Sequence, residues 1–447
     1  MLEKAKILLS KNSGSHMQEI MRKGSVAFAL KIAGAALMFV FHVVIARLLG
    51  ASGSGIYFLA LTIITFSAAL ARYGMDDCIT KYVANFSSVN NWPATKKTLH
   101  FATKLTLIAS AIITAIIYLS SGFIATTIFN KNELEVPLQN LALATPAYAL
   151  MMIYARAHQG IKNVRESMLL QNVIIPLFGI MFVYILVPLH GASGAALAYT
   201  LSAFIAFAYG YAMWKRKSNV SSKVTNDFVG KDLLLCSTPL LGAIILQQLV
   251  LAIPIITLGI YSDSAEVGYY STAYRTAALV GLVLIAANSI IAPKFAVLFR
   301  NNDMRNLEDV AQKSALLITG MATPAIIAFI VFPQWVMGIF GKEFEAAWVM
   351  LLIIAAGQFI NVVTGSVGFL LTMTGHEKSF LSANAWAVAL CLVLSIILIP
   401  IYSGLGAAVA AALSMATINL LRVNFVIKNI GIIPIPFFGK ITEGDKK

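Results

Sequence analysis

The chain has 447 residues, of which 59% are hydrophobic and only 12% charged, with a formal net charge of +14. Soluble proteins of this length do not have such a composition, so it excludes soluble enzymes and binding domains and predicts a membrane protein. The positive charge indicates attraction to anionic lipid headgroups rather than to nucleic acid.

Long stretches without charged side chains predict the membrane crossings. A hydrocarbon core of roughly 30 Å needs about 20 helical residues, and such stretches fill most of the chain. Two of the longest are divided by proline–glycine turns, PLHG at 188–191 and PIYSG at 400–404, so each predicts a helical hairpin. The twelve predicted spans are 24–46, 54–73, 101–121, 137–158, 167–188, 193–214, 235–259, 267–292, 313–333, 347–372, 379–400 and 405–427.

The distribution of lysine and arginine predicts the orientation. Most basic residues of the loops fall on the side of the N-terminus, whereas the opposite loops carry Arg47, Lys131 and Lys342. Because loops rich in these residues stay in the cytoplasm, both termini are predicted to be cytoplasmic. The first span is too long for a signal peptide and is interpreted as an uncleaved anchor.

Two pairs of segments predict an internal repeat. PLHGASGAALAYTLS at 188–202 aligns with PIYSGLGAAVAAALS at 400–414, and GIYFLA at 55–60 aligns with GYYSTA at 268–273. The offsets are 212 and 213 positions. Each half then has six spans, and because six is even both halves enter the membrane from the same side. We expect an all-α polytopic membrane protein of about twelve transmembrane helices, in two six-helix parallel repeats around a central cavity.

The repeat also predicts the domain organisation. We expect a cytoplasmic N-terminal segment at 1–23, an N-terminal six-helix lobe at 24–214, a cytoplasmic linker at 215–232, a C-terminal six-helix lobe at 233–428 and a cytoplasmic tail at 429–447. Two lobes joined by one linker suit a transporter that works by alternating access.

The sequence contains no pattern typical of a catalytic or metal site. The acidic pair Asp76 and Asp77 is interpreted as a solvated pair at a helix end. Cys78, Cys236 and Cys391 are interpreted as small residues without a disulfide or a metal. We therefore predict that the protein is not an enzyme and needs no cofactor, and proton or sodium coupling stays open.

Basic residues within or beside the spans predict a cationic cavity. An arginine near the bilayer centre costs at least ~2.5–3.5 kcal/mol, and Arg275 lies deep in its span. Lys31 and His42 share one face of the first span, and Arg47 follows at its outer end. The alternatives are interface anchoring for Lys31 and Arg47, and a hydrogen bond between helices for His42.

Four uncharged polar residues complete the predicted substrate site. Gln247 and Gln248 lie in the middle of the seventh span, and Gln358 and Asn361 lie on one stripe of the tenth. Side-chain amides suit the hydroxyl groups of sugars. The alternative is that they form hydrogen bonds that hold helices together.

The segment IARLLGASGSGIYFLALTIITFSAALARYGMDDCITKYVANF, at 45–86, resembles the opening of the polysaccharide-export family. This family holds the O-antigen and related flippases of the multidrug/oligosaccharidyl-lipid/polysaccharide exporter superfamily. The resemblance rests on an Ala-Arg-x-Leu-Gly turn, a Gly-x-Tyr start of the second span and an Arg-Tyr-Gly-Met exit.

The resemblance implies a function. It implies a flippase that moves a polyprenyl-pyrophosphate-linked oligosaccharide from the inner to the outer leaflet of a bacterial inner membrane, in O-antigen and lipopolysaccharide biosynthesis. It also implies a polysaccharide polymerase and glycosyltransferases as partners. In that setting Arg275 and the other basic residues would bind the diphosphate.

Three other functions are alternatives. Multidrug exporters of the same superfamily use carboxylates within the membrane, which the predicted spans lack in their cores. The lipid II flippase branch usually has two additional C-terminal spans, which this chain lacks after Lys428. A membrane-embedded polysaccharide polymerase usually needs a sizeable outer loop, and none is predicted here.

Overall fold

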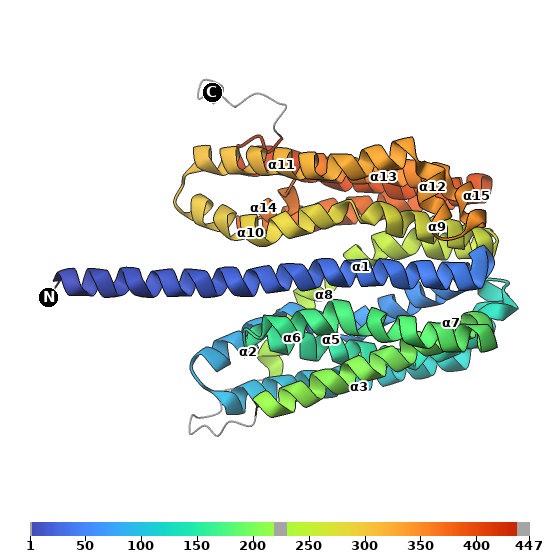
Figure 1. The fold of residues 1–447 in the computed structure, drawn as a ribbon, viewed down its shortest axis with the longest axis horizontal. Coiled ribbons are helices and arrows are strands. Elements are labelled where there is room, and N and C mark those ends of the chain that lie inside the picture. The colour runs from blue at the N-terminus through green and yellow to red at the C-terminus, as the bar shows by residue number, and fades with distance from the viewer. Residues whose placement is uncertain (1, 219–229, 436–447) are drawn as a thin grey trace.

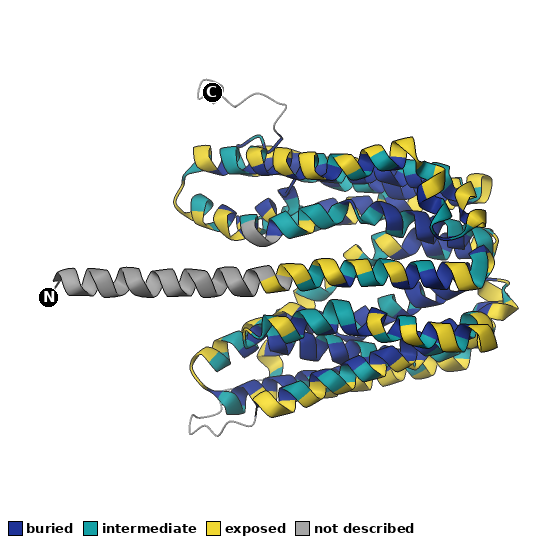
Figure 2. Ribbon diagram, viewed as in Figure 1, coloured by how far each residue is buried: buried dark blue, intermediate teal, exposed yellow. Residues whose placement is uncertain are grey.

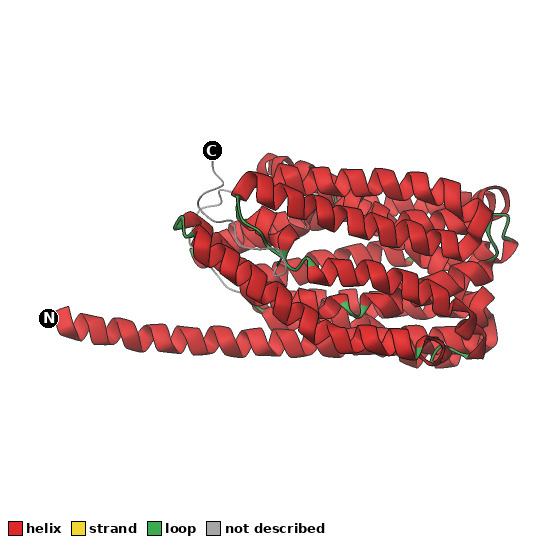
Figure 3. Cartoon of the chain, turned by 90° about the horizontal axis from the view of Figure 1, so that it is seen from above, coloured by secondary structure: helices red, strands yellow, loops and turns green. Residues whose placement is uncertain are grey.

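The computed structural model describes residues 2–218 and 230–435, except for the side chains of residues 2–25, 27, 289 and 290. The described residues form helices and no strands, so the all-α fold class is confirmed (Figure 3). The elements in chain order are α1 (Leu2–Ala71), α2 (Met75–Ser88), α3 (Trp92–Phe123), η1 (Ile124–Ile128), η2 (Asn132–Leu134), α4 (Glu135–Ala142), α5 (Ala144–Gly160), α6 (Val164–Met168), η3 (Leu169–Val173), α7 (Ile174–Lys217), α8 (Gly230–Tyr261), α9 (Ser264–Ala278), α10 (Gly281–Arg300), α11 (Met304–Val331), α12 (Pro333–Gly338), η4 (Lys342–Ala347), α13 (Trp348–Val363), α14 (Val367–Met373) and α15 (Glu377–Ile430).

Three of the helices change direction at a single residue. The backbone leaves the helical region at Gly50 in α1, at Gly191 in α7 and at Ser403 in α15, each with positive φ. Glycine adopts these angles without steric cost, which accounts for the first two positions. The breaks in α7 and α15 are 212 positions apart (403 minus 191), the offset of the repeated segments.

Close approaches on either side of these breaks show that the chain doubles back. A side-chain carbon on Gly194 would lie 2.2 Å from the carbonyl oxygen of Leu186, and one on Gly406 would lie 2.4 Å from that of Leu398. Eight residues of continuous helix span about 12 Å, so neither contact is possible without a reversal. The two hairpins therefore have the same local geometry.

The number of crossings follows from these reversals. Seven described helices are long and apolar enough to cross a membrane, and two bent helix pairs bring this to nine. Three of the seven are the reversing helices, so if each bent pair is one crossing and each reversing helix is two, the described residues supply twelve crossings. This is the number expected from the sequence.

Three predicted spans are less regular than expected. The span at 137–158 is bent by 40° between α4 and α5, and the span at 267–292 by 42° between α9 and α10. The span at 347–372 is interrupted at Gly365, whose φ of 67° ends α13. Local turns of this kind leave the apolar pattern intact, so hydropathy alone does not detect them.

The helices form two bundles, one from α1 to α7 and one from α8 to α15. The part of α1 before its break at Gly50 runs along the boundary between them (Figure 1). We call the end with the α2–α3 and α10–α11 turns the inner end, because it is the side predicted to face the cytoplasm, and the opposite end the outer end. Buried residues lie on the helix faces turned toward neighbouring helices (Figure 2). The predicted linker at 215–232 falls largely on residues 219–229, outside the described residues, so the domain boundaries stay a prediction.

The lobes are in backbone contact at the outer end. A side-chain carbon on Gly55 would lie 1.7 Å from the carbonyl oxygen of Ser264, and one on Gly268 would lie 2.2 Å from that of Ala51. The Ala51 backbone also donates a hydrogen bond of 3.0 Å to Oε1 of Glu343. The outer end is therefore closed by a packed contact between α1 and α9.

Basic side chains at the predicted outer loops add to this closure. Arg47 Nε donates a hydrogen bond of 2.7 Å to the carbonyl oxygen of Ile339 in the other lobe. Lys131 Nζ donates to the carbonyl oxygens of Gly259 and Ser262, at 2.6 and 2.8 Å. Partial burial lowers the pKa of the Lys131 ammonium.

The prediction of no disulfide is wrong. Cys78 on α2 and Cys236 on α8 are joined by a disulfide between the two lobes, whereas Cys391 is free and buried. The two cysteines are 158 positions apart in sequence. They meet because α2 packs against α8, and the sequence around either cysteine does not indicate this contact.

Candidate functional site

A cavity of about 440 Å³ lies between the two lobes. Its walls come from α1, on both sides of its break at Gly50, and from α5, α7, α8, α9 and α10, and most of the lining side chains are apolar. The polar lining residues are His42, Thr62, Thr65, Tyr148, Tyr199, Gln248, Ser271, Tyr274 and Arg275. A mostly apolar pocket with a few convergent polar groups is the usual form of a ligand site.

Arg275 is the cationic group of this cavity. Its Nη1 donates a hydrogen bond of 3.1 Å to His42 Nε2, across the boundary between the lobes. Because arginine only donates, the imidazole must be neutral with its proton on Nδ1. The guanidinium carbon also lies 4.5 Å from the centroid of the Phe58 ring, a cation–π contact that helps to hold the group in a low-dielectric site.

No carboxylate of the described residues neutralises the charge of Arg275. No carboxylate in the described part of the chain lies within 4 Å of its guanidinium, and its buried Nε has no hydrogen-bond partner. A buried charge without a counter-ion costs free energy that an anionic ligand can offset.

Hydroxyl groups surround this position. The hydroxyls of Tyr57 and Ser271 are buried without a hydrogen-bond partner, and Ser271 lines the cavity one turn before Arg275. The rings of Tyr148 and Tyr199 form a tilted pair with centroids 6.2 Å apart. Such rings offer a ligand both an apolar surface and a hydrogen-bonding hydroxyl.

The structure brings three of the eight predicted site residues together at the cavity, namely Arg275, His42 and Gln248. Lys31 lies on α1, one helical turn before the lining residue Ala35, and is partly buried. Its proximity to the cavity keeps it a candidate. Whether any of these residues binds substrate stays a prediction.

The other four predicted residues lie elsewhere. Arg47 is part of the outer-end contact, where it bonds a backbone carbonyl. Gln247 is exposed on α8, although its neighbour lines the cavity. Gln358 and Asn361 bond to each other at 3.3 Å on α13, outside the cavity lining.

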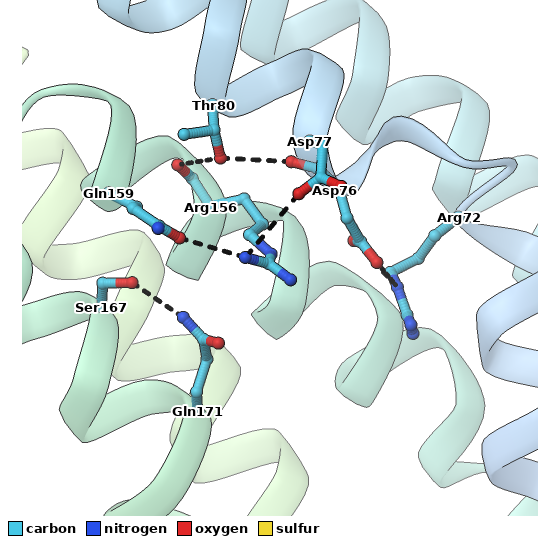
Figure 4. Close-up of polar contacts among 8 residues, drawn as sticks. All are labelled: Arg72, Asp76, Asp77, Thr80, Arg156, Gln159, Ser167 and Gln171. Atoms are coloured by element: carbon cyan, nitrogen blue, oxygen red, sulfur yellow. Dashed lines mark hydrogen bonds and ion pairs between the residues drawn. The ribbon is translucent and has the colours of Figure 1, made fainter. Parts of the chain in front are cut away.

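A second polar cluster lies at the inner end of the N-terminal lobe (Figure 4). Arg72 Nε donates to both carboxylate oxygens of Asp76, at 3.0 and 3.1 Å, and both side chains are 8% exposed. Arg156 donates to Gln159 at 3.1 Å and lies 4.0 Å from Asp77, which is 72% exposed. The interpretation of the acidic pair as solvated is therefore correct for Asp77 and wrong for Asp76.

The Arg72–Asp76 pair differs from Arg275 in its electrostatics. Its charges cancel, so it adds little net positive charge to the nearby cavity, where Arg72 lies 5.9 Å from the ring of the lining residue Tyr148. Arg72 lies in the turn between α1 and α2, and Asp76 lies in the first turn of α2, so the helical spacing of side chains does not indicate this pair. The Arg72–Asp76 ion pair was not predicted, because Asp76 was expected to lie in water.

A further buried arginine also escaped the sequence analysis. Arg422 Nη2 donates a hydrogen bond of 2.7 Å to Asn384 Oδ1, and its guanidinium carbon lies 4.5 Å from the Phe380 ring centroid. Arg422 is close to the inner end of the last predicted span, 405–427. It lies within the C-terminal lobe and does not line the cavity between the lobes.

The comparisons with known proteins identify the family. A model of the family described as "Polysaccharide biosynthesis protein" matches residues 20–299. The chain belongs to this family. It is also 26% identical over 418 residues, which are 91% of this chain and 84% of the relative, to a probable low-salt glycan biosynthesis flippase of Haloferax volcanii.

Two solved structures of transporters have the same fold. The lipid II flippase MurJ, in an inward closed conformation, has a TM-score of 0.73 at 15% identity over 90% of this chain and 87% of its own. A transporter of Pyrococcus furiosus, described as having a binding pocket of reverse polarity, has a TM-score of 0.68 at 14% identity, over 92% and 95%. These likenesses show that the chain has the fold of these two proteins.

Proposed function

We propose that the protein is a flippase that moves a polyprenyl-pyrophosphate-linked oligosaccharide from the inner to the outer leaflet. The observation that carries this proposal is Arg275, a cation without a carboxylate partner in the described residues, on the wall of a cavity between two lobes. The family and the flippase relative support the same class of cargo.

The diphosphate is the part of the cargo that Arg275 would bind. Diphosphate oxygens match the planar donor fork of a guanidinium, and the attraction is stronger beside the mostly apolar wall of the cavity than in bulk water. His42 would orient the guanidinium through the bond to its Nη1. Gln248 and the tyrosine hydroxyls would contact the sugar next to the diphosphate, with Lys31 attracting the head group from the inner end.

Alternating access would supply the transport step. With the outer-end contact closed, the head group enters from the inner side, and separation of the lobes at Gly55 and Gly268 would then release it outward. We place the protein in the inner membrane of a bacterial cell with both termini in the cytoplasm, between glycosyltransferases that build the repeat unit and a polymerase that uses it outside.

The polarity of the cavity argues against an exporter of cationic drugs. Such a substrate would need an acidic group to offset its charge, whereas the charged group in the described lining of the cavity is an arginine. The Asp76 carboxylate is occupied by Arg72. We therefore assign the anionic lipid-linked glycan and not a drug.

A deletion experiment tests this assignment. Loss of the gene should abolish surface glycan and leave lipid-linked repeat units accumulated on the inner leaflet, with little change in susceptibility to cationic dyes. Restoration of glycan by a plasmid copy is the control. Normal surface glycan together with increased dye sensitivity would instead identify a drug exporter.

A further inference from the structure

A second, apolar cavity of about 360 Å³ lies on the membrane-facing side of α8. It is formed by the part of α1 after the break at Gly50, by α8 and by the part of α15 before the break at Ser403. Its described lining contains no charged residue, and Leu392 and Ile396 on its rim are 44% and 51% exposed. We call this cavity the tail groove. It opens toward the hydrocarbon core of the membrane.

The tail groove adjoins the cavity that contains Arg275. Phe66 on α1 and Ala252 on α8 line both cavities, so at this point one aromatic ring and one methyl group form the partition. Because the two cavities lie on different faces of α8, this helix separates the compartment that contains Arg275 from one whose described lining has no charged residue. Such an arrangement fits a ligand with one polar end and one apolar end.

The tail groove also runs in a suitable direction. Its lining on α8 extends from Leu249 to Tyr261, about 18 Å along the helix toward the outer end. A lipid whose head group enters from the inner leaflet has its tail directed toward the outer leaflet. The tail groove would guide such a tail while the outer-end contact is still closed.

We propose that the tail groove binds the first isoprene units of a polyprenyl chain while the diphosphate of the same molecule lies at Arg275. This inference rests on the proposed function, because it requires a cargo that joins a diphosphate to a long apolar chain. Because the diphosphate and the polyprenyl chain are covalently joined, a head group in the cavity needs an apolar path nearby for its chain. The tail groove adjoins the cavity at Phe66 and Ala252 and would provide that path.

Photo-crosslinking tests the tail groove directly. Benzoylphenylalanine would be placed at Ile396 in the tail groove, or at the neighbouring Ile397, which is 55% exposed on α15 but does not line it. The purified proteins in nanodiscs would be illuminated with radiolabelled undecaprenyl diphosphate without sugars. We expect an adduct at 396 that exceeds the one at 397 several-fold and is competed by unlabelled undecaprenyl diphosphate but not by phospholipid. Equal adducts, no adduct, or competition by phospholipid would overturn the proposal.

A blocking variant connects the tail groove to transport. Ile396→Trp should fill it and slow the flipping of lipid-linked oligosaccharide in proteoliposomes, whereas Ile397→Trp should not, at equal amounts of inserted protein. Wild-type flipping without selective crosslinking at 396 would reject the tail groove and leave the flippase assignment intact. Selective crosslinking by a wild-type protein that does not flip the oligosaccharide would reject the flippase assignment and retain a polyprenyl site.

Discussion

Gly55 and Gly268 lie against each other where the two lobes meet, and a side-chain carbon on Gly55 would be 2.9 Å from the backbone nitrogen of Gly268. They occupy matching positions in the repeated segments GIYFLA and GYYSTA. A position that must approach another backbone this closely has no room for a side chain. The repeat therefore places two equivalent glycines at the contact that closes the outer end.

Gly268→Ala should weaken this closure. The added methyl group would lie 2.2 Å from the carbonyl oxygen of Ala51, and overpacking of this kind typically costs ~1–3 kcal/mol, or about 5–150-fold in an equilibrium between conformations. We expect faster labelling of a Ser271→Cys reporter in the cavity by a membrane-impermeant maleimide added outside. Gly320→Ala is the matched control, because nothing lies within 4 Å of that site. Identical labelling of both variants would contradict the role of the glycine contact.

The disulfide between Cys78 and Cys236 should restrain the lobes. It joins α2 to α8 at the inner end, so it limits how far these two helices can separate when the lobes move. We expect the oxidised protein in proteoliposomes to flip its cargo more slowly than the reduced protein. The double variant Cys78→Ala/Cys236→Ala should be insensitive to the reductant. A reductant effect of equal size in the double variant, or none in the wild type, would show that this link does not limit transport.

Asn384→Ala should destabilise the C-terminal lobe. Asn384 supplies the 2.7 Å acceptor for the buried guanidinium of Arg422, and loss of one partner of a buried polar group costs about 1–3 kcal/mol. The measurement is the thermal unfolding midpoint in detergent. Asn429→Ala removes an exposed hydrogen bond to Ser379 on the same helix and should stay within ~0.5 kcal/mol of the wild type. Equal midpoints for the two variants would mean that Arg422 is stabilised in another way.

Local signals predicted much of the fold. The turns PLHG and PIYSG were expected to divide two hairpins, and the structure breaks α7 at Gly191 and α15 at Ser403. These reversals depend on residues within a few positions of one another, so the sequence contains the necessary information. The same is true of the all-helical class, which follows from the spacing and length of the apolar segments.

The candidate site was less accessible to sequence reasoning. Arg275 stood out because an arginine in a membrane span is costly, but its contacts with His42 and Phe58 come from a helix more than 200 positions away. The disulfide partner of Cys78 and the burial of Asp76 likewise depend on which helices pack against α2. Such contacts between distant segments are properties of the packed bundle.

The most direct test of the account is the rate at which Arg275 variants flip a fluorescent lipid-linked oligosaccharide in proteoliposomes. Removal of a charge-assisted hydrogen bond costs about 1.5–3 kcal/mol, so Arg275→Ala should slow flipping by roughly 10- to 150-fold at equal insertion. Arg275→Lys should retain part of the rate, since the charge remains without the donor fork, and Arg275→Glu should abolish flipping by repulsion of the diphosphate. A correctly inserted Arg275→Ala protein that flips the oligosaccharide at the wild-type rate would contradict the claim that this guanidinium binds the head group.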